Sequence, residues 1–117
     1  MEFSSLPLKL SASRDVGTGM LYNVTSLAEP LHASLAQLIS ALPTGAEIAV
    51  PDPDDNDGSL DVSRLDDGLF VKRGRHGAHG TWRPEGLDGA VAWLYHGASR
   101  SEGARSGLWV WVPHQNR

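Results

Sequence analysis

The stretch around which the chain is organised runs from position 51 to position 84 and reads PDPDDNDGSLDVSRLDDGLFVKRGRHGAHGTWRP. Its centre, residues 59–73, alternates apolar and polar side chains on both sides of an Asp-Asp-Gly turn, which is the pattern of a β-hairpin. We expect Asp67-Gly68 at the tip of this turn. One extra residue near Leu65 interrupts the alternation and indicates a β-bulge.

Charge is distributed unevenly along this stretch. The formal net charge of the whole chain is −4, but half of its 14 acidic residues lie between positions 52 and 67. The next segment, up to Pro84, has no acid and contains four bases: Lys72, Arg73, Arg75 and Arg83. Surface patches of one sign steer charged partners. The acidic loop 51–58 and the basic glycine-rich loop 72–83 are therefore the first functional candidates.

Hydrophobic periodicity on either side of the hairpin predicts further strands and a first helix. Period-two alternation or a short apolar run predicts strands at 6–10, 20–24, 46–50 and 108–112. Leucines spaced by three or four residues predict a helix over 26–42. This helix begins either at Ser26, which has capping-box spacing to Glu29, or with Pro30 at its first helical position.

A second helix completes the expected architecture. Leu87, Val91 and Leu94 have helical spacing, so we expect a helix over 87–96 with Gly97 as its stop. The chain length fits one domain. The sequence therefore predicts a single α+β domain over 1–117, with a mostly antiparallel sheet of five to six strands and two packed helices.

The composition is that of a globular protein and excludes several classes of site. Of the 117 residues, 40% are hydrophobic and 21% are charged, which argues against disorder. The absence of cysteine excludes disulfides, thiolate metal ligands and thiol nucleophiles, and it agrees with a reducing compartment. No run approaches the roughly 20 apolar residues that span a bilayer, and the N-terminus does not resemble a signal peptide. We expect a cytoplasmic protein with no membrane partner.

The candidate metal ligands do not form a recognised motif. Counted from Asp52, positions six and twelve of the acidic loop are Asp57 and Ser63, where an EF-hand loop needs glycine and glutamate. His76 and His79 are three residues apart but are flanked by glycines, so they lack the rigid platform of a zinc site. Exposed loop histidines are the simpler interpretation, and we expect no metal and no other cofactor.

Signatures of catalysis are also missing from the chain. It contains no Gly-x-Ser-x-Gly elbow, phosphate loop or dinucleotide fingerprint. We therefore expect a protein that is not an enzyme. A small enzyme whose site is assembled from scattered histidines and aspartates is one alternative.

A nucleic-acid-binding or regulatory module is the other alternative. The four bases of loop 72–83, with Trp82 as a stacking surface, combine the groups that contact phosphates and bases. The acidic balance of the whole chain argues against this function, because nucleic-acid-binding domains are usually basic over a face.

Two tryptophans near the C-terminus form another candidate surface. Trp109 and Trp111 point to one side of the last expected strand, and Leu108, Val110 and Val112 point to the other. Such a strand either lies in a sheet that is covered on both faces, or its tryptophans belong to an interface. If no helix covers their side, they form the kind of aromatic patch found at binding hot spots.

In size, acidic charge, lack of cysteine, mixed strand–helix order and absence of catalytic motifs, the whole chain resembles the bacterial immunity proteins that act against polymorphic or contact-delivered toxins. The resemblance implies a cytoplasmic protein that binds a cognate toxin or effector and occludes its active site. It transfers no site residue by residue.

The partner-binding residues are expected from the clustering of charged and aromatic side chains. The acidic loop would dock into a basic cleft of the partner, whereas the basic loop would suit an acidic partner. Either loop could also serve a homodimer. The expected partner-binding residues are Asp52, Asp54, Asp55, Asp57, Asp61, Arg73, Arg75, His76, His79, Trp82, Trp109 and Trp111.

Overall fold

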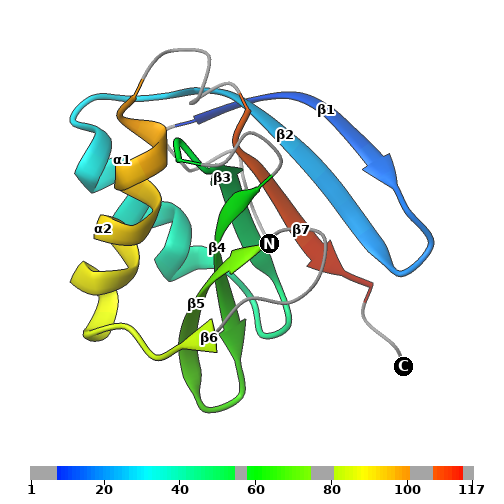
Figure 1. Cartoon of the computed structure of the whole chain (residues 1–117). Coiled ribbons are helices and arrows are strands. Elements are labelled where there is room, and N and C mark those ends of the chain that lie inside the picture. Colours follow the sequence, from blue (N-terminus) through cyan, green and yellow to red (C-terminus); the bar gives the residue numbers. More distant parts are fainter. Residues whose placement is uncertain (1–7, 55–57, 75–80, 101–106, 115–117) are drawn as a thin grey trace.

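The computed structural model describes residues 8–54, 58–74, 81–100 and 107–114. They form one antiparallel sheet with strand order β1-β2-β7-β3-β4-β5-β6, together with two helices (Figure 1). The strands are β1 Leu8–Asp15, β2 Gly19–Leu27, β3 Glu47–Pro51, β4 Ser59–Leu65, β5 Gly68–Gly74, β6 Thr81–Trp82 and β7 Trp109–Pro113. The helices are α1 Leu31–Ala41 and α2 Gly86–Ala98.

The α+β prediction is confirmed, with seven strands in place of five or six. The additional strand is β6, which lies inside the predicted basic loop. It has only two residues, so it carries no periodicity that a sequence pattern could reveal.

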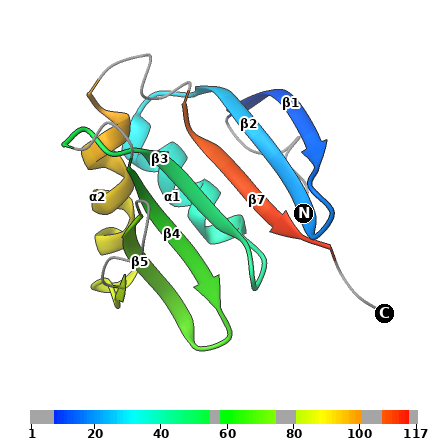
Figure 2. The same cartoon turned by 45° about the vertical axis from the view of Figure 1, so that its right-hand side comes forward.

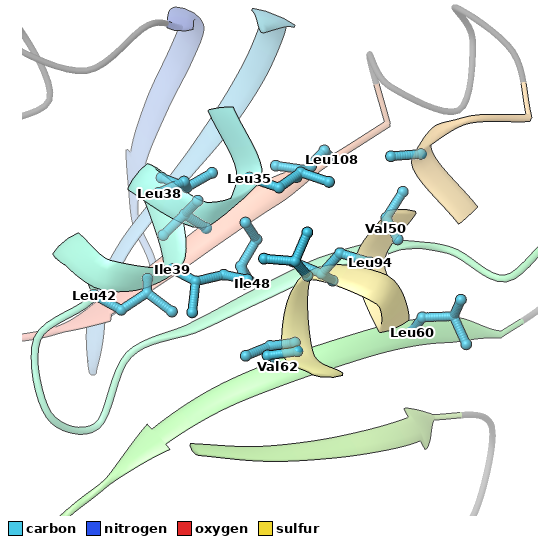
Figure 3. Packing of buried hydrophobic residues seen from close by; sticks show 14 of the residues in the cluster. Leu35, Leu38, Ile39, Leu42, Ile48, Val50, Leu60, Val62, Leu94 and Leu108 are labelled. Carbon is cyan, nitrogen blue, oxygen red and sulfur yellow. The ribbon is translucent and has the colours of Figure 1, made fainter. Parts of the chain in front are cut away.

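Both helices pack on the same face of the sheet, and the β1–β2 hairpin extends past them (Figures 1 and 2). Ile48, Val62 and Val110 are paired in register across β3, β4 and β7, so their side chains share this face. They meet the buried stripe of α1 and Leu94 of α2 in one hydrophobic core (Figure 3). The labelled residues of that core are Leu35, Leu38, Ile39, Leu42, Ile48, Val50, Leu60, Val62, Leu94 and Leu108.

The first helix begins after Pro30, and the prediction of a start at Ser26 is wrong. Ser26 belongs to β2, where it pairs with Lys9 of β1. Pro30 has an extended backbone (φ −76°, ψ 143°) and occupies the N-cap position of α1, so the first helical residue is Leu31, one residue after the alternative start. Proline has no N–H to donate and a fixed φ, so it is tolerated at the start of a helix and not in its interior.

The central hairpin is confirmed, but without the predicted bulge. The register of β4 and β5 is continuous from the pair Ser59–Gly74 to the pair Leu65–Gly68, so residues 66–67 form the two-residue loop. Leu65 departs from the apolar pattern because it lies at the hairpin end and is 45% exposed. The irregular register occurs between β1 and β2 instead, near Leu10.

Gly97 does not stop the second helix, which continues to Ala98. It is buried where α2 crosses the end of β3, and a Cβ at this position would lie 2.7 Å from the backbone oxygen of Pro51. Gly97 is needed here because only a residue without a side chain allows this close approach of helix and strand. Its role is in packing and not in helix termination.

The last strand is internal to the sheet, between β2 and β3. Val110 of this strand and Leu108 just before it are buried under the helices, whereas Trp109 and Trp111 point to the opposite face and are half-buried. Within the described part of the chain, no helix covers that opposite face (Figure 2).

Candidate protein-binding site

The two oppositely charged loops meet at one end of the sheet. Arg73 Nε lies 2.9 Å from Oδ2 of Asp52, and Arg73 Nη2 lies 3.9 Å from Oδ2 of Asp54. The strand register explains the meeting, because Val50, Leu60 and Arg73 form one row on the helix side of β3, β4 and β5. Asp52 follows Val50 by two residues. Charges that were expected to form two separate patches therefore partly neutralise each other.

Asp52 also fixes the backbone of the acidic loop through hydrogen bonds to Asp54 and Gly58. Its side chain is fully buried. Its Oδ1 accepts a hydrogen bond of 2.9 Å from the backbone N–H of Asp54, which is an Asx turn. Its own backbone N–H donates to the carbonyl of Gly58. Asp52 thus positions its neighbours and does not present a carboxylate to a partner.

Two tryptophans extend this cluster of charges toward the edge of the sheet. The indole Nε1 of Trp93 in α2 donates a 3.2 Å hydrogen bond to the carbonyl of Lys72, and the guanidinium carbon of Arg73 lies 5.8 Å from the Trp93 ring centroid. Trp82 in the edge strand β6 packs against Trp93, with ring centroids 5.7 Å apart and planes tilted by 54°. Trp82 is 49% exposed. One large aromatic ring is thus held in place and half open to solvent.

His96, one helical turn after Trp93, completes the group. Its Nε2 lies 3.2 Å from Oδ2 of Asp54. The hydrogen bond to His96 lowers the pKa of Asp54. Burial opposes this change, and the charges of His96, Arg100 and Arg73 reinforce it. We call the following residues the Trp–Arg cluster: Asp52, Asp54, Arg73, Trp82, Trp93 and His96.

Two further bases of the predicted basic loop are also paired with acids. Lys72 Nζ lies 3.9 Å from Oδ2 of Asp61 and 4.0 Å from Oε2 of Glu47. Arg83 Nη2 lies 3.3 Å from Oδ2 of Asp67, and its Nη1 donates a 2.9 Å hydrogen bond to the Asp67 carbonyl. With Arg73 held by Asp52, each of these three bases already has a carboxylate neighbour.

Asp61 lies on the sheet face opposite the helices, and it is buried. Burial raises its pKa, and the neighbouring Glu47 acts in the same direction. A 2.7 Å hydrogen bond from Ser59 Oγ and the charge of Lys72 oppose this rise. As with Asp52, the buried carboxylate is not presented at the surface.

The structure divides the predicted partner-binding residues into three groups. It brings together Asp52, Asp54, Arg73 and Trp82, and it places Asp61, Trp109 and Trp111 on the opposite sheet face. The remaining five lie outside the described residues: Asp55, Asp57, Arg75, His76 and His79.

Sequence reasoning missed two members of the cluster. Neither Trp93 nor His96 is among the expected partner-binding residues. The spacing of these two residues could have indicated that they lie together, because positions 93 and 96 share one face of a helix.

Two shallow hollows lie on the helix layer, away from the Trp–Arg cluster. One, of about 420 Å³, is lined by Ala36, Gln37, Ser40 and Ala41 of α1. The other, of about 410 Å³ between α1 and α2, is lined by His32, Ala33, Ala36, Asp88, Val91 and Ala92. The described residues contain no group of three or more histidine and carboxylate side chains that could hold a metal ion. Nor, within the same residues, is either helix long and apolar enough to cross a membrane.

Comparison with models of protein families, with curated protein sequences and with solved structures finds no match to this chain.

Proposed function

We propose that this protein is a protein-binding domain of the immunity type, which neutralises a cognate toxin or effector by covering its active site. The contact surface is the exposed part of the Trp–Arg cluster. The observation that carries the proposal is Trp82, a half-exposed indole packed against a second indole beside an arginine. Tryptophan and arginine are the residues most enriched at the energetic centres of protein interfaces.

The cluster is organised before any partner binds. Asp52 holds Arg73, the carbonyl of Lys72 holds the indole N–H of Trp93, and Trp93 supports Trp82. A side chain that is already ordered loses little conformational entropy on binding, so more of its contact energy contributes to affinity.

The same contacts favour protein binding over the nucleic-acid alternative. Lys72, Arg73 and Arg83 each have a carboxylate neighbour, so phosphates would have to compete with those carboxylates. Asp54 and Arg73 are 58% and 41% exposed beside the aromatic rings, which gives the surface both signs of charge. A mixed surface of this kind suits the polar rim of a protein interface.

Affinity capture from native cells tests the proposal, with the tagged full chain as bait. Wild type should recover one protein in stoichiometric amount, and Trp82→Ala should lose it. Gln37→Ala, which changes an exposed residue of α1 outside the cluster, is the matched control and should recover the same protein.

Neutralisation is then tested with the recovered protein itself. Its expression should arrest growth, and co-expression of the wild-type chain, but not of Trp82→Ala, should restore it. Equal recovery by wild type and Trp82→Ala would reject this surface. A recovered protein whose activity the chain leaves unchanged would reject the inhibitory function.

A further inference from the structure

The charged groups near the Trp–Arg cluster are unequally satisfied. The bases of β5 and of the segment after β6 are engaged, as described above. Among the residues that the structure describes, two exposed acids near Arg83 have no described cation within 4.0 Å: Asp66, next to Asp67, and Glu85, two residues after Arg83. Among the described residues, the surface around Trp82 and Arg83 therefore offers unpaired carboxylates, which complement a basic partner.

The exposed ring of Trp82 lies within this acidic setting. Glu85, exposed at the start of α2, follows it by three residues. A second acid, Asp54, is connected to Trp82 indirectly. Asp54 lies beside Arg73, and Arg73 lies against the Trp93 ring on which Trp82 packs. One carboxylate thus follows Trp82 closely in the chain, and a second is linked to Trp82 through Arg73 and Trp93.

The cluster itself contains a guanidinium placed against an indole ring. Arg73 lies against the Trp93 ring at 5.8 Å. Trp82 carries the same kind of ring, with 49% of its surface exposed, and no cation lies over that ring among the described residues. An indole face attracts cations through its quadrupole, and the planar guanidinium of arginine stacks on it better than the ammonium of lysine does.

We infer that the partner is basic at this contact and places an arginine side chain on the exposed face of Trp82. This inference rests on the proposed function, since it names the chemistry of the partner that the Trp–Arg cluster binds. Glu85 and Asp54 attract the arginine, and Trp82 stacks on it.

Nuclear magnetic resonance of the ¹⁵N-labelled full chain tests the inference with defined probes. The probes are the peptide acetyl-Gly-Arg-Gly-Arg-Gly-amide and its citrulline counterpart, which keeps the shape and lacks the charge. The indole N–H signal of Trp82 is identified by its absence in Trp82→Leu. At equal concentration the arginine peptide should shift this signal about two- to fivefold more than the citrulline peptide, as expected for one exposed cation–π contact.

Charge variants separate the local acids from the general charge of the chain. Glu85→Gln and Asp54→Asn should each reduce the shift caused by the arginine peptide. Asp88→Asn is the matched control, because Asp88 lines the hollow between α1 and α2, and it should leave the shift unchanged.

Equal shifts from both peptides, or an equal loss of the shift in Asp88→Asn, would overturn the inference. Its failure and that of the proposed function are distinguishable. If Trp82→Ala loses the captured protein while the two peptides behave alike, the proposed function stands and the arginine contact is rejected. If the peptides differ as expected but no captured protein depends on Trp82, the arginine chemistry stands and the proposed function is rejected.

Discussion

Arg73 and Asp52 form an ion pair with unequal burial. Arg73 Nε lies 2.9 Å from Oδ2 of Asp52, yet the arginine side chain is 41% exposed and the aspartate side chain is fully buried. The arginine can reach water if it loses its partner, whereas the aspartate cannot. This asymmetry means that the two residues are not equivalent in mutagenesis, although they share one interaction.

Replacement of Arg73 should destabilise the fold more than replacement of Asp52. Arg73→Met leaves a buried carboxylate without its cation and should lower the free energy of unfolding by roughly 2–3 kcal/mol, somewhat below the range for fully buried pairs. Asp52→Asn should cost about 1 kcal/mol, because the amide oxygen can still accept the N–H of Asp54 and Arg73 can be hydrated. Urea denaturation of both variants measures the difference.

The double variant completes this test. Asp52→Asn with Arg73→Met should be less destabilised than the sum of the two single changes, because the buried charge and its partner are removed together. Strictly additive effects would show that the pair does not interact as the geometry indicates.

Gly97→Ala should destabilise the protein despite the higher helix propensity of alanine. The new Cβ would lie 2.7 Å from the Pro51 carbonyl oxygen and 2.9 Å from Cγ1 of Val50, so helix and strand must move apart. We expect the free energy of unfolding to fall by about 1–3 kcal/mol, which is typical of overpacking.

Gly89→Ala in the same helix is the control. Its nearest neighbour would be the Pro84 side chain at 3.2 Å, so the propensity gain should roughly offset the contact. Equal thermal stability of Gly97→Ala and wild type would contradict the close approach.

Asp61→Asn should stabilise the protein at neutral pH. The folded state raises the pKa of Asp61 above its ordinary value of 3.8, so the ionised carboxylate is less favourable in the fold than in the unfolded chain. Below pH 3.8 the group is neutral in both states, and variant and wild type should be equally stable. As the pH rises through the raised pKa, wild type should fall behind by roughly 0.5–1 kcal/mol, the size of a weak ionic interaction. Unfolding free energies at pH 3 and pH 7 measure the difference. A variant that is less stable at pH 7 would contradict this environment of Asp61.

Asp15→Asn should show the opposite dependence on pH. Asp15 Oδ1 lies 3.0 Å from His114 Nε2 and accepts a 2.8 Å hydrogen bond from the N–H of Gly17. The hydrogen bond to His114, followed by that from Gly17, lowers the pKa of Asp15 from its ordinary value of 3.8. The stabilisation by the carboxylate is therefore present above pH 3.8 and is lost as the pH falls through the lowered pKa.

The melting temperature of Asp15→Asn should accordingly lie below that of wild type at neutral pH, with the gap closing in acid. Asp66→Asn, at an exposed position in the loop between β4 and β5, serves as the control and should melt close to wild type at both pH values. A gap that persists unchanged in acid would show that the effect does not depend on ionisation of Asp15.

The amino-acid sequence by itself determined the type and position of those helices and strands whose hydrophobic periodicity extends over several residues. The leucine stripe of α1, the alternation of β4 and β5 and the apolar run of β7 each repeat over several residues, so burial of one face dictates the structure. Deviations occurred where a single residue decided the outcome. Pro30 set the start of α1, Gly97 permits the close packing of α2 on β3, and β6 is too short to show a pattern.

The candidate site could be read from the sequence only in part. Asp52, Asp54, Arg73 and Trp82 are conspicuous by charge or size, but they were assigned to separate surfaces. Only the tertiary structure decided that Arg73 meets Asp52 and that Trp93 supports Trp82. In the sheet, β4 alone separates β3 from β5, and α2 packs across all three strands. The physical reason is that periodicity specifies which face of an element is buried, whereas the pairing of distant elements depends on the packing of the whole chain.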